Sequence, residues 1–446
     1  MSNKKHGLFA LFLPIFLELL FTILAGMVDT MMLSSVGDQA VGAVGTANSY
    51  INVFLVLFTI ISSGMMAVMT QYIGAQRPGI AQQTLHLGLL VNLAAGVVIT
   101  LLLCVGADWI LTLVGIARDL RGPARIYMQT VGLFCVCSAL TPVYSSYLRA
   151  FGHTASTMYA TIFSNVVNFL LNALFLFVLD MGVFGVALAT GISRVINLLW
   201  VWMASRCRIR KIPEPNRLKN GEIFHKIMRI GLPGAMEIFL YNLAMMLVTS
   251  FLNRMDSTGV QVTARAYAAQ IANFSYCASS ALAQANAILV GWRIGAGEVQ
   301  LCDRETRRNA VVGILLAGAG AALLVLFCEP ILGFFTQDPQ MLRLVEILLV
   351  IEIALEMGRS ANMIFGFSLK ASGDAAYPMM IAVVFMFLCA VGGTWFFGIK
   401  MGWLVVGSYV GMALDECIRA VLMFLRWHKG YWKNKNLVNG SGKTVS

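Results

Sequence analysis

Two carboxylates lie inside a long apolar stretch near the beginning of the chain. Residues 13–33, LPIFLELLFTILAGMVDTMML, include Glu18 and Asp29. On a helix their separation of eleven residues, about three turns, places both side chains on nearly the same face and roughly 16 Å apart. An ionised carboxylate in the middle of a bilayer is disfavoured by about 2.5–3.5 kcal/mol or more. We therefore expect both groups to face the protein interior, where they pair with a cation or hold a proton, as proton and cation carriers do.

Amide side chains in a later apolar segment could serve as partners for Asp29. Asn165, Asn168 and Asn172 follow the i, i+3, i+7 spacing, which places them on one face of a helix. The alternative is that Asp29 is a structural residue bonded to Asn or Thr side chains. Each Asn taken alone is typical of a contact that holds two helices together.

The second half of the chain contains a denser set of charged residues. Glu352, Glu356 and Arg359 lie at i, i+4 and i+7 in VIEIALEMGRSANMIF. This spacing predicts an ion pair between Glu356 and Arg359 and leaves Glu352 without a partner. A proton-linked switch in which Arg359 changes partner is the alternative. Asp415 and Arg419 form an i, i+4 pair that we interpret as structural.

These residues must be positioned by helices that span a membrane. Hydrophobic residues make up 59% of the chain and charged residues 12%, with a mean hydropathy of +0.78, whereas soluble domains contain about 25% charged residues. Long apolar runs exclude a membrane β-barrel, whose strands give short alternating patterns. We predict an all-α membrane protein with twelve transmembrane helices of about 20 residues or more. The segments are 8–33, 44–70, 83–106, 123–147, 154–178, 184–206, 227–252, 265–290, 309–333, 341–368, 375–398 and 402–426.

The distribution of positive charge predicts the orientation of these helices. With both termini on the cytoplasmic side, 22 Lys and Arg residues fall inside and 7 outside, as the positive-inside rule requires. The net charge of +11 therefore indicates topology and contact with anionic lipids rather than nucleic-acid binding. We expect a multi-pass protein of a bacterial plasma (inner) membrane.

Signals of catalysis and of cofactor binding are missing from the sequence. The nine Cys and five His residues show no metal-ligand or redox spacing. The chain has no GxxxxGK[ST] loop for a nucleotide, and no catalytic triad can be assembled with any specificity. We therefore predict that the protein is not an enzyme and holds no cofactor and no resident metal.

Three short motifs recur at nearly one offset. LPIFLE (13–18) matches LPGAME (232–237) at an offset of 219, while 71–77 matches 292–298 and 147–161 matches 368–382, both at 221. Halves with an even number of helices are parallel repeats, an arrangement used by alternating-access transporters. The predicted organisation is an amino-terminal six-helix lobe (1–206), a basic cytoplasmic linker (207–226), a carboxy-terminal six-helix lobe (227–426) and a basic cytoplasmic tail (427–446).

Taken together, these motifs resemble those of the MATE multidrug exporters. The resemblance is carried by LP…Glu…VDT, an IGA turn after the second helix and L-[RK]-A-x-G before the fifth, all repeated after a basic linker. ALAQANAILVG (281–291) and ALDECIRAVLMFLRWHKGYW (413–432) resemble the bacterial branch. The resemblance covers essentially the whole chain. It implies two lobes around a central cavity and export of amphipathic, often cationic compounds, driven by inward movement of Na⁺ or H⁺ through a protein that we expect to be monomeric.

The resemblance also implies roles for individual residues. Asp29, in VDT, occupies the place of the acid that belongs to the amino-lobe cation site, so H⁺ or Na⁺ is expected there, with Glu352 and Glu356 as further coupling candidates. The candidates for the substrate cavity are Glu18, Glu237, Tyr241, Asn165 and Asn168.

The two cavity glutamates are repeat mates, and each lies four residues after a proline. Their alternative role is to bond backbone groups that the proline leaves free. The chain departs from the family pattern at Tyr241, where many exporters carry the acid of the seventh helix. The repeat counterpart of Asp29 is Val248, so the two lobes are not expected to be equivalent in their ion chemistry.

Two other classes of function compete with drug export. A flippase for lipid-linked precursors, from the same superfamily, would be favoured by two extra helices and by a basic cavity. The sequence shows twelve segments, and its buried charges are mostly acidic. A channel or a membrane enzyme is disfavoured by the repeated halves with unmatched carboxylates.

Overall fold

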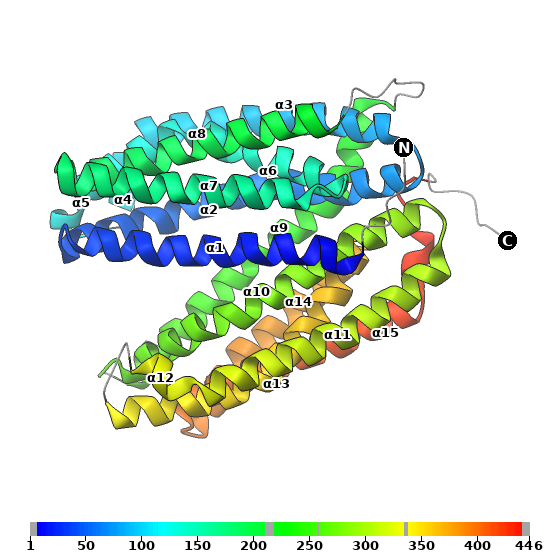
Figure 1. Cartoon of the computed structure of the whole chain (residues 1–446). Helices are drawn as coiled ribbons and strands as arrows, with labels where there is room; N and C mark the ends of the chain where they lie inside the picture. The colour runs from blue at the N-terminus through cyan, green and yellow to red at the C-terminus, as the bar shows by residue number, and fades with distance from the viewer. Residues whose placement is uncertain (1–6, 114, 210–217, 257, 334–337, 439–446) are drawn as a thin grey trace. The chain divides into compact units, whose positions relative to one another are not determined.

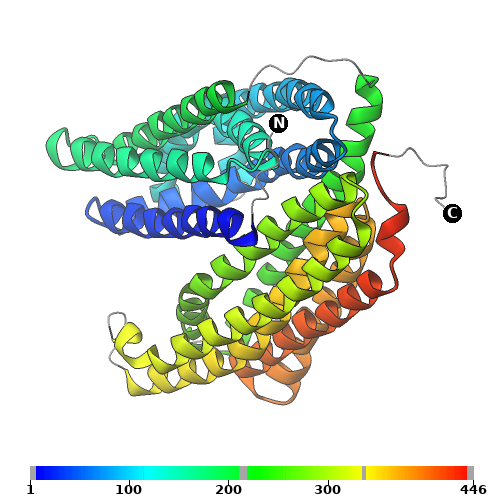
Figure 2. The same ribbon diagram turned by 45° about the vertical axis from the view of Figure 1, so that its right-hand side comes forward.

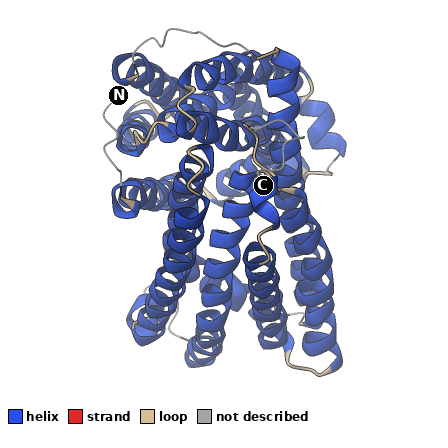
Figure 3. Ribbon diagram, turned by 90° about the vertical axis from the view of Figure 1, so that its right-hand side faces the viewer, coloured by secondary structure: helices blue, strands red, loops and turns tan. Residues whose placement is uncertain are grey.

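Every regular element of the described chain is helical. The computed structural model describes residues 7–113, 115–209, 218–256, 258–333 and 338–438, and within these ranges it contains no strand (Figures 1 and 3). The chain divides into two compact units, Met1–Gly231 and Leu232–Ser446. Within each unit the long helices run beside one another (Figures 1 and 2).

Unit 1 contains the helices of the first half of the chain. They are α1 (Leu8–Ser34), α2 (Asp38–Gly74), α3 (Pro78–Val105), α4 (Ala107–Leu113), α5 (Arg118–Leu133), α6 (Cys135–Ala150), α7 (Thr154–Ala173), which continues as the π-helix η1 (Leu174–Val178), α8 (Gly182–Arg208) and the first turns of α9 (Asn220–Met255). Helix α1 packs against α7, α7 packs against α8, and α2, α3 and α6 pack against one another. Their shared core includes Phe58, Leu103 and Tyr127.

Unit 2 is built around one helix, which packs against three others. Helix α13 (Pro339–Ser372) contacts α10 (Val260–Gly295), α11 (Val299–Leu326) and α15 (Leu404–His428). The remaining elements are α12 (Cys328–Leu332), α14 (Ala376–Phe385) with the π-helices η2 (Met386–Val391) and η3 (Thr394–Lys400), and the 3₁₀ helix η4 (Tyr431–Asn434). Helix α13 begins with Pro339 at its first position, and Asp338 accepts a hydrogen bond from the Gln340 amide at 2.9 Å, a favourable N-terminal cap.

Eight helices of the described chain are long and apolar enough to cross a membrane. They are α1, α2, α3, α7 with η1, α8, α9, α11 and α14 with its π-helical continuation. The segment predicted as one span at 123–147 is instead a pair, α5 and α6, bent by 48°. The bend lies at Phe134, whose ring packs directly on Gly191 of α8. The other long helices are α10, α13 and α15. Helices α13 and α15 contain charged residues in their middle turns, which lowers their mean hydropathy.

The repeated L-[RK]-A-x-G motif ends a helix in each half. Gly152 follows α6 with φ of 82°, and Gly373 follows α13 with φ of 102°. Both glycines adopt the left-handed conformation that commonly terminates helices. The amide of Gly152 donates to Arg149 O at 2.9 Å, and the amide of Gly373 donates to Lys370 O at 3.1 Å. The motif therefore fixes where the basic residue emerges from its helix.

The chain after α15 folds back onto unit 2. Trp427 and Trp432 stack with their ring centroids 4.2 Å apart, and both are buried. Asp374, in the turn after α13, binds Arg426 at 2.9 Å and Lys435 at 2.6 Å. Two cations around one buried carboxylate hold this part of the basic tail in place.

Candidate functional site

Asp29 lies in a polar site between α1 and α7. Asn172 donates to Asp29 Oδ1 at 2.9 Å. Asn168, with its amide nitrogen toward the carboxylate, donates to Oδ1 at 2.8 Å and to Oδ2 at 3.2 Å. The remaining amide oxygen, Asn172 Oδ1, is buried and has no hydrogen-bond partner in the described chain. A buried acceptor without a donor costs free energy, and a donor or a cation that reached this oxygen would satisfy it.

Glu18, three turns before Asp29, forms an ion pair instead of facing an open site. Its carboxylate lies 2.7 Å from Arg149 of α6 and accepts a hydrogen bond from Thr157 of α7 at 2.8 Å. The carboxylate therefore bonds side chains of other helices. Arg149 is a partner that the sequence analysis missed, although it belongs to one of the repeated motifs.

Glu237 has the same arrangement in unit 2. Its carboxylate lies 2.7 Å from Lys370 of α13. Glu237 is offset from Glu18 by 219 residues, and Lys370 is offset from Arg149 by 221. Each unit thus contains one acid–base pair between its first helix and the helix that ends in the glycine motif, and the matching offsets were the signal for this pairing.

Arg359 contacts three carboxyl groups of unit 2. It lies against Glu356, the pair expected from the sequence, and 3.5 Å from Glu352. Its Nε lies 3.7 Å from Glu416 of α15. The expectation that Glu352 has no partner was wrong, because the guanidinium is planar and carries five donors that can serve several acceptors.

A second arginine completes this cluster. Arg419 lies 2.8 Å from Asp415 and 2.8 Å from Glu416. Asn362 of α13 also donates to Glu416 at 2.8 Å. We call Glu352, Glu356, Arg359, Asp415, Glu416 and Arg419 the charge cluster of unit 2. Sequence analysis did not assign Glu416 or Asn362, because their contact joins two different helices and the two residues are 54 positions apart in the sequence.

Two further candidate residues are Asn165 and Tyr241. Asn165 donates to the backbone oxygen of Phe21 at 3.3 Å. Tyr241 on α9 is exposed. Arg194 of α8 is a further charged residue of unit 1, and its Nη1 atom is buried without a hydrogen-bond partner in the described residues.

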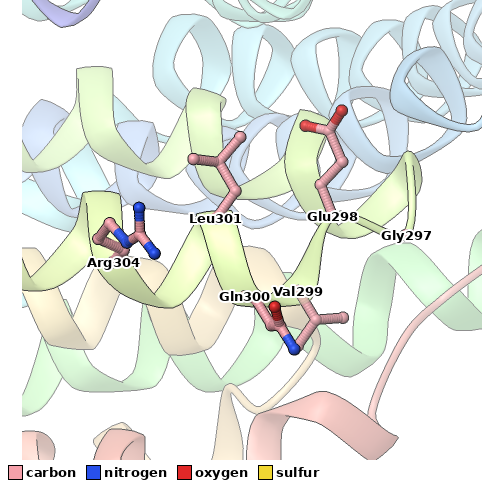
Figure 4. A pocket seen from close by; sticks show the side chains of 6 residues that line it. All are labelled: Gly297, Glu298, Val299, Gln300, Leu301 and Arg304. Carbon is pink, nitrogen blue, oxygen red and sulfur yellow. The ribbon is translucent and has the colours of Figure 1, made fainter.

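A pocket also lies at the turn between α10 and α11, away from the buried carboxylates. Its volume is about 590 Å³, and Gly297, Glu298, Val299, Gln300, Leu301 and Arg304 line it (Figure 4). Glu298 is paired with Arg293. This pocket is a feature of a helix turn and shows no grouping that would bind an ion or a drug specifically.

The fold and these sites define a class of protein. Long apolar helices that carry buried, paired carboxylates in two repeated units are the architecture of a membrane transporter. A protein-family model, MatE, matches residues 14–174 and 233–396. The chain belongs to this family, the MATE transporters, which confirms the family and the fold class predicted from the sequence.

Individual relatives agree with this assignment. An uncharacterized transporter of Bacillus subtilis, YisQ, is 30% identical over 98% of this chain and 97% of its own length. A probable multidrug resistance protein of Thermotoga maritima, NorM, is 23% identical over 97% of this chain and 94% of its own.

Solved structures share the fold. A multidrug resistance MATE family transporter of the MOP superfamily in an outward-facing conformation has a TM-score of 0.86 at 19% identity, covering 95% of this chain and 94% of that one. A MOP superfamily transporter from Pyrococcus furiosus has a TM-score of 0.87 at 18% identity, covering 97% and 96%.

Proposed function

We propose that this protein is an antiporter that exports amphipathic, cationic compounds in exchange for H⁺ or Na⁺. The observation that carries the proposal is the Asp29 site, where two amides surround a carboxylate and the oxygen of Asn172 has no partner. Relatives described as multidrug resistance proteins support drug export as the transport activity.

In this mechanism Asp29 binds the coupling ion first. A proton neutralises the carboxylate, whereas Na⁺ is held by carboxylate and amide oxygens. Either ion removes negative charge from unit 1 and weakens its attraction for a cationic substrate, which is released outside. Coupling requires that the ion bind one conformation more tightly than the other. Glu352 and Glu356 are the corresponding coupling candidates of unit 2.

Each six-helix lobe contributes candidate residues for substrate binding. We propose lobes at 1–206 and 227–426, a basic linker at 207–226 and a basic tail at 427–446, in a monomer in the plasma membrane with both termini cytoplasmic and with anionic lipids as neighbours. The proposed cavity residues are Glu18, Glu237, Tyr241, Asn165 and Asn168. Because Glu18 and Glu237 are held in ion pairs, each would have to exchange its basic partner for a cationic substrate.

The test is efflux of a fluorescent cation from vesicles that contain the protein, with a Na⁺ gradient and a pH gradient imposed separately. We expect one gradient to drive transport and Asp29→Asn to abolish it. Asp256→Asn is the matched control, because it is the same substitution made in the turn between α9 and α10, outside the helices. Hydrogen bonds from Thr258 lower the pKa of the Asp256 carboxyl.

Driven efflux by Asp29→Asn at the rate of the parent protein would refute the role of Asp29. Absence of efflux under both gradients would refute drug export and favour a lipid-linked substrate.

A further inference from the structure

We infer that the charge cluster of unit 2 holds two protons at neutral pH, one shared by Glu352 and Glu356 and one on Asp415. This deepens the proposed function by adding a second proton-carrying site, on α13 and α15. The part played by these protons in transport rests on the proposed antiport, whereas their presence follows from the cluster itself.

The first argument is the balance of charge. The cluster contains four carboxyl groups and two guanidinium groups. Glu352, Glu356, Asp415, Glu416 and Arg419 are all at least nine-tenths buried, with exposed fractions of 0–6%. If all six groups were ionised, two negative charges would lie uncompensated in the interior of a membrane protein. A buried group in that position takes up a proton instead.

The contacts show which carboxyl group stays ionised near Arg419. Glu416 is approached by three donors, namely Asn362 at 2.8 Å, Arg419 at 2.8 Å and Arg359 at 3.7 Å. Donors of this kind favour the charged form of a carboxyl group. Glu416 is therefore the carboxyl group with more donors of the two that share Arg419.

Asp415 shares Arg419 with Glu416 but has fewer partners. Its Oδ2 accepts from Arg419 at 2.8 Å. Its Oδ1 is buried and has no hydrogen-bond partner in the part of the chain that is described. One arginine cannot neutralise two carboxylates, and the group with an unpartnered oxygen is the one that takes the proton.

The α13 residues repeat this arrangement around Arg359. Glu352 and Glu356 lie one turn apart on α13, and both of their carboxyl groups contact Arg359. If both were ionised, this one guanidinium would leave one negative charge uncompensated, so the pair takes up one proton. Glu356 also contacts Arg359, while its Oε2 is buried without a partner among the described residues. Arg359 thus neutralises one negative charge of the pair and the proton neutralises the other.

Neighbouring groups add no cation to the cluster. Lys370 is paired with Glu237 at 2.7 Å. Arg265 of α10 donates to Thr249 at 2.5 Å and to Met245 Sδ at 3.5 Å, rather than to a carboxyl group of the cluster. Glu237, which faces Arg419, is the carboxyl group that Lys370 pairs with. The other titratable groups that face the cluster are thiols and phenols: Tyr241 on α9, Tyr276 and Cys277 on α10, Cys389 on η2, and Tyr409 and Cys417 on α15.

The protons tie α13 to α15. Loss of the Asp415 proton would place two carboxylates against Arg419, and loss of the shared proton would do the same at Arg359. Either deprotonation creates an uncompensated buried charge unless the helices separate or solvent enters. A conformational change that exposes the cluster would therefore release protons, as an exchange transporter requires.

Infrared spectroscopy of the purified full-length protein tests the inference, because protonated carboxyl groups absorb apart from carboxylates. The protein carries the Asp29→Asn substitution, which removes the other membrane aspartate without a cationic partner. Two samples are isotopically labelled at the side-chain carboxyl carbon, one in Asp and one in Glu, and sodium-free buffer is used. We expect absorption by protonated carboxyl groups at neutral pH. The contribution of Asp should shift in the Asp-labelled sample, and the contribution of Glu should shift in the Glu-labelled sample.

Substitutions in the cluster then assign the two absorptions to residues. Asp415→Asn should remove the absorption of protonated Asp, and Glu352→Gln should remove the absorption of protonated Glu. Glu416→Gln should also remove the absorption of protonated Asp, because Arg419 would then serve Asp415 alone and ionise it; a purely structural Glu416 would not change that absorption. Asp256→Asn is the control and should change nothing. The labelled samples need no cluster substitution, so an unstable variant does not prevent the test.

Absence of protonated-carboxyl absorption at neutral pH would overturn the inference, as would a signal from Glu alone. Absorption that disappears when Na⁺ is added would show that the cluster binds sodium in place of protons and would also overturn it. If the parent protein, with Asp29 intact, shows no efflux while both absorptions are present in the Asp29→Asn protein, the proposed antiport is refuted and the proton assignment stands.

Discussion

The ion pair between Glu18 and Arg149 leads to a prediction about stability. The equivalent pair in the second half of the chain serves as its control. The pair lies 2.7 Å apart with side chains 13% and 16% exposed, and Thr157 adds a hydrogen bond at 2.8 Å. Removing one partner of a buried pair costs about 3–5 kcal/mol, and interhelical hydrogen bonds in membrane proteins contribute about 0.6 kcal/mol on average. Because some solvent reaches this pair, we expect Glu18→Gln to lower the free energy of unfolding by about 2–3 kcal/mol.

The assay is reversible unfolding in mixed micelles, read by circular dichroism, for E18Q, R149Q and the double variant. The double variant should cost less than the sum of the single variants by about 1–2 kcal/mol, since both remove one interaction. The pair Glu237–Lys370 is the matched control: its side chains are 23% and 19% exposed, and no hydroxyl donor to Glu237 was found in the described chain. We expect E237Q to cost about 1 kcal/mol less than E18Q. Additive single variants, or a larger cost for E237Q, would refute this reasoning.

Two glycine substitutions give further predictions. A Cβ at Gly64 of α2 would lie 2.2 Å from the backbone oxygen of Ile227, so Gly64→Ala should cost about 1–3 kcal/mol and lower the thermal midpoint measured by fluorescence-detected gel filtration. Gly26→Ala in α1 meets nothing within 4 Å and should leave that midpoint unchanged; equal midpoints would contradict the close contact. Gly373 has φ of 102°, and a Cβ there would lie 2.4 Å from Lys435 O. Gly373→Ala should therefore cost about 1–2 kcal/mol or more and speed tryptic cleavage after Lys435; unchanged cleavage would show that the tail is held in another way.

The sequence was sufficient to predict the helices, because membrane spans are long apolar runs that local composition reveals. The first span was predicted at 8–33 and lies at Leu8–Ser34. The bend at Phe134 was not predicted; it lies where the Phe134 ring packs on Gly191, a residue far away in the sequence. Hydropathy alone cannot reveal such a contact.

The candidate sites show the same limit. Pairs within one helix, such as Asp415–Arg419, follow from spacing. Pairs between helices, such as Arg149 with Glu18, require the packing of the helices to be known. Glu416 was missed for this reason, since its partners lie on α13 as well as on its own helix.

The two units share their structural pairs but differ in the chemistry of their interiors. The glycine-terminated helix and the acid–base pair occur in both, at offsets of 219 to 221 residues. The residues that could carry ions do not recur: Val248 stands at the repeat position of Asp29, and Asp415 stands at that of Arg194. The recurrent pairs therefore fit a role in fixing helix positions. The candidate ion sites instead differ between the units, with one carboxylate and two amides in unit 1 and a cluster of four carboxyl groups and two arginines in unit 2. If both act as proposed, they would exchange protons over different pH ranges, whereas two identical sites would share one range.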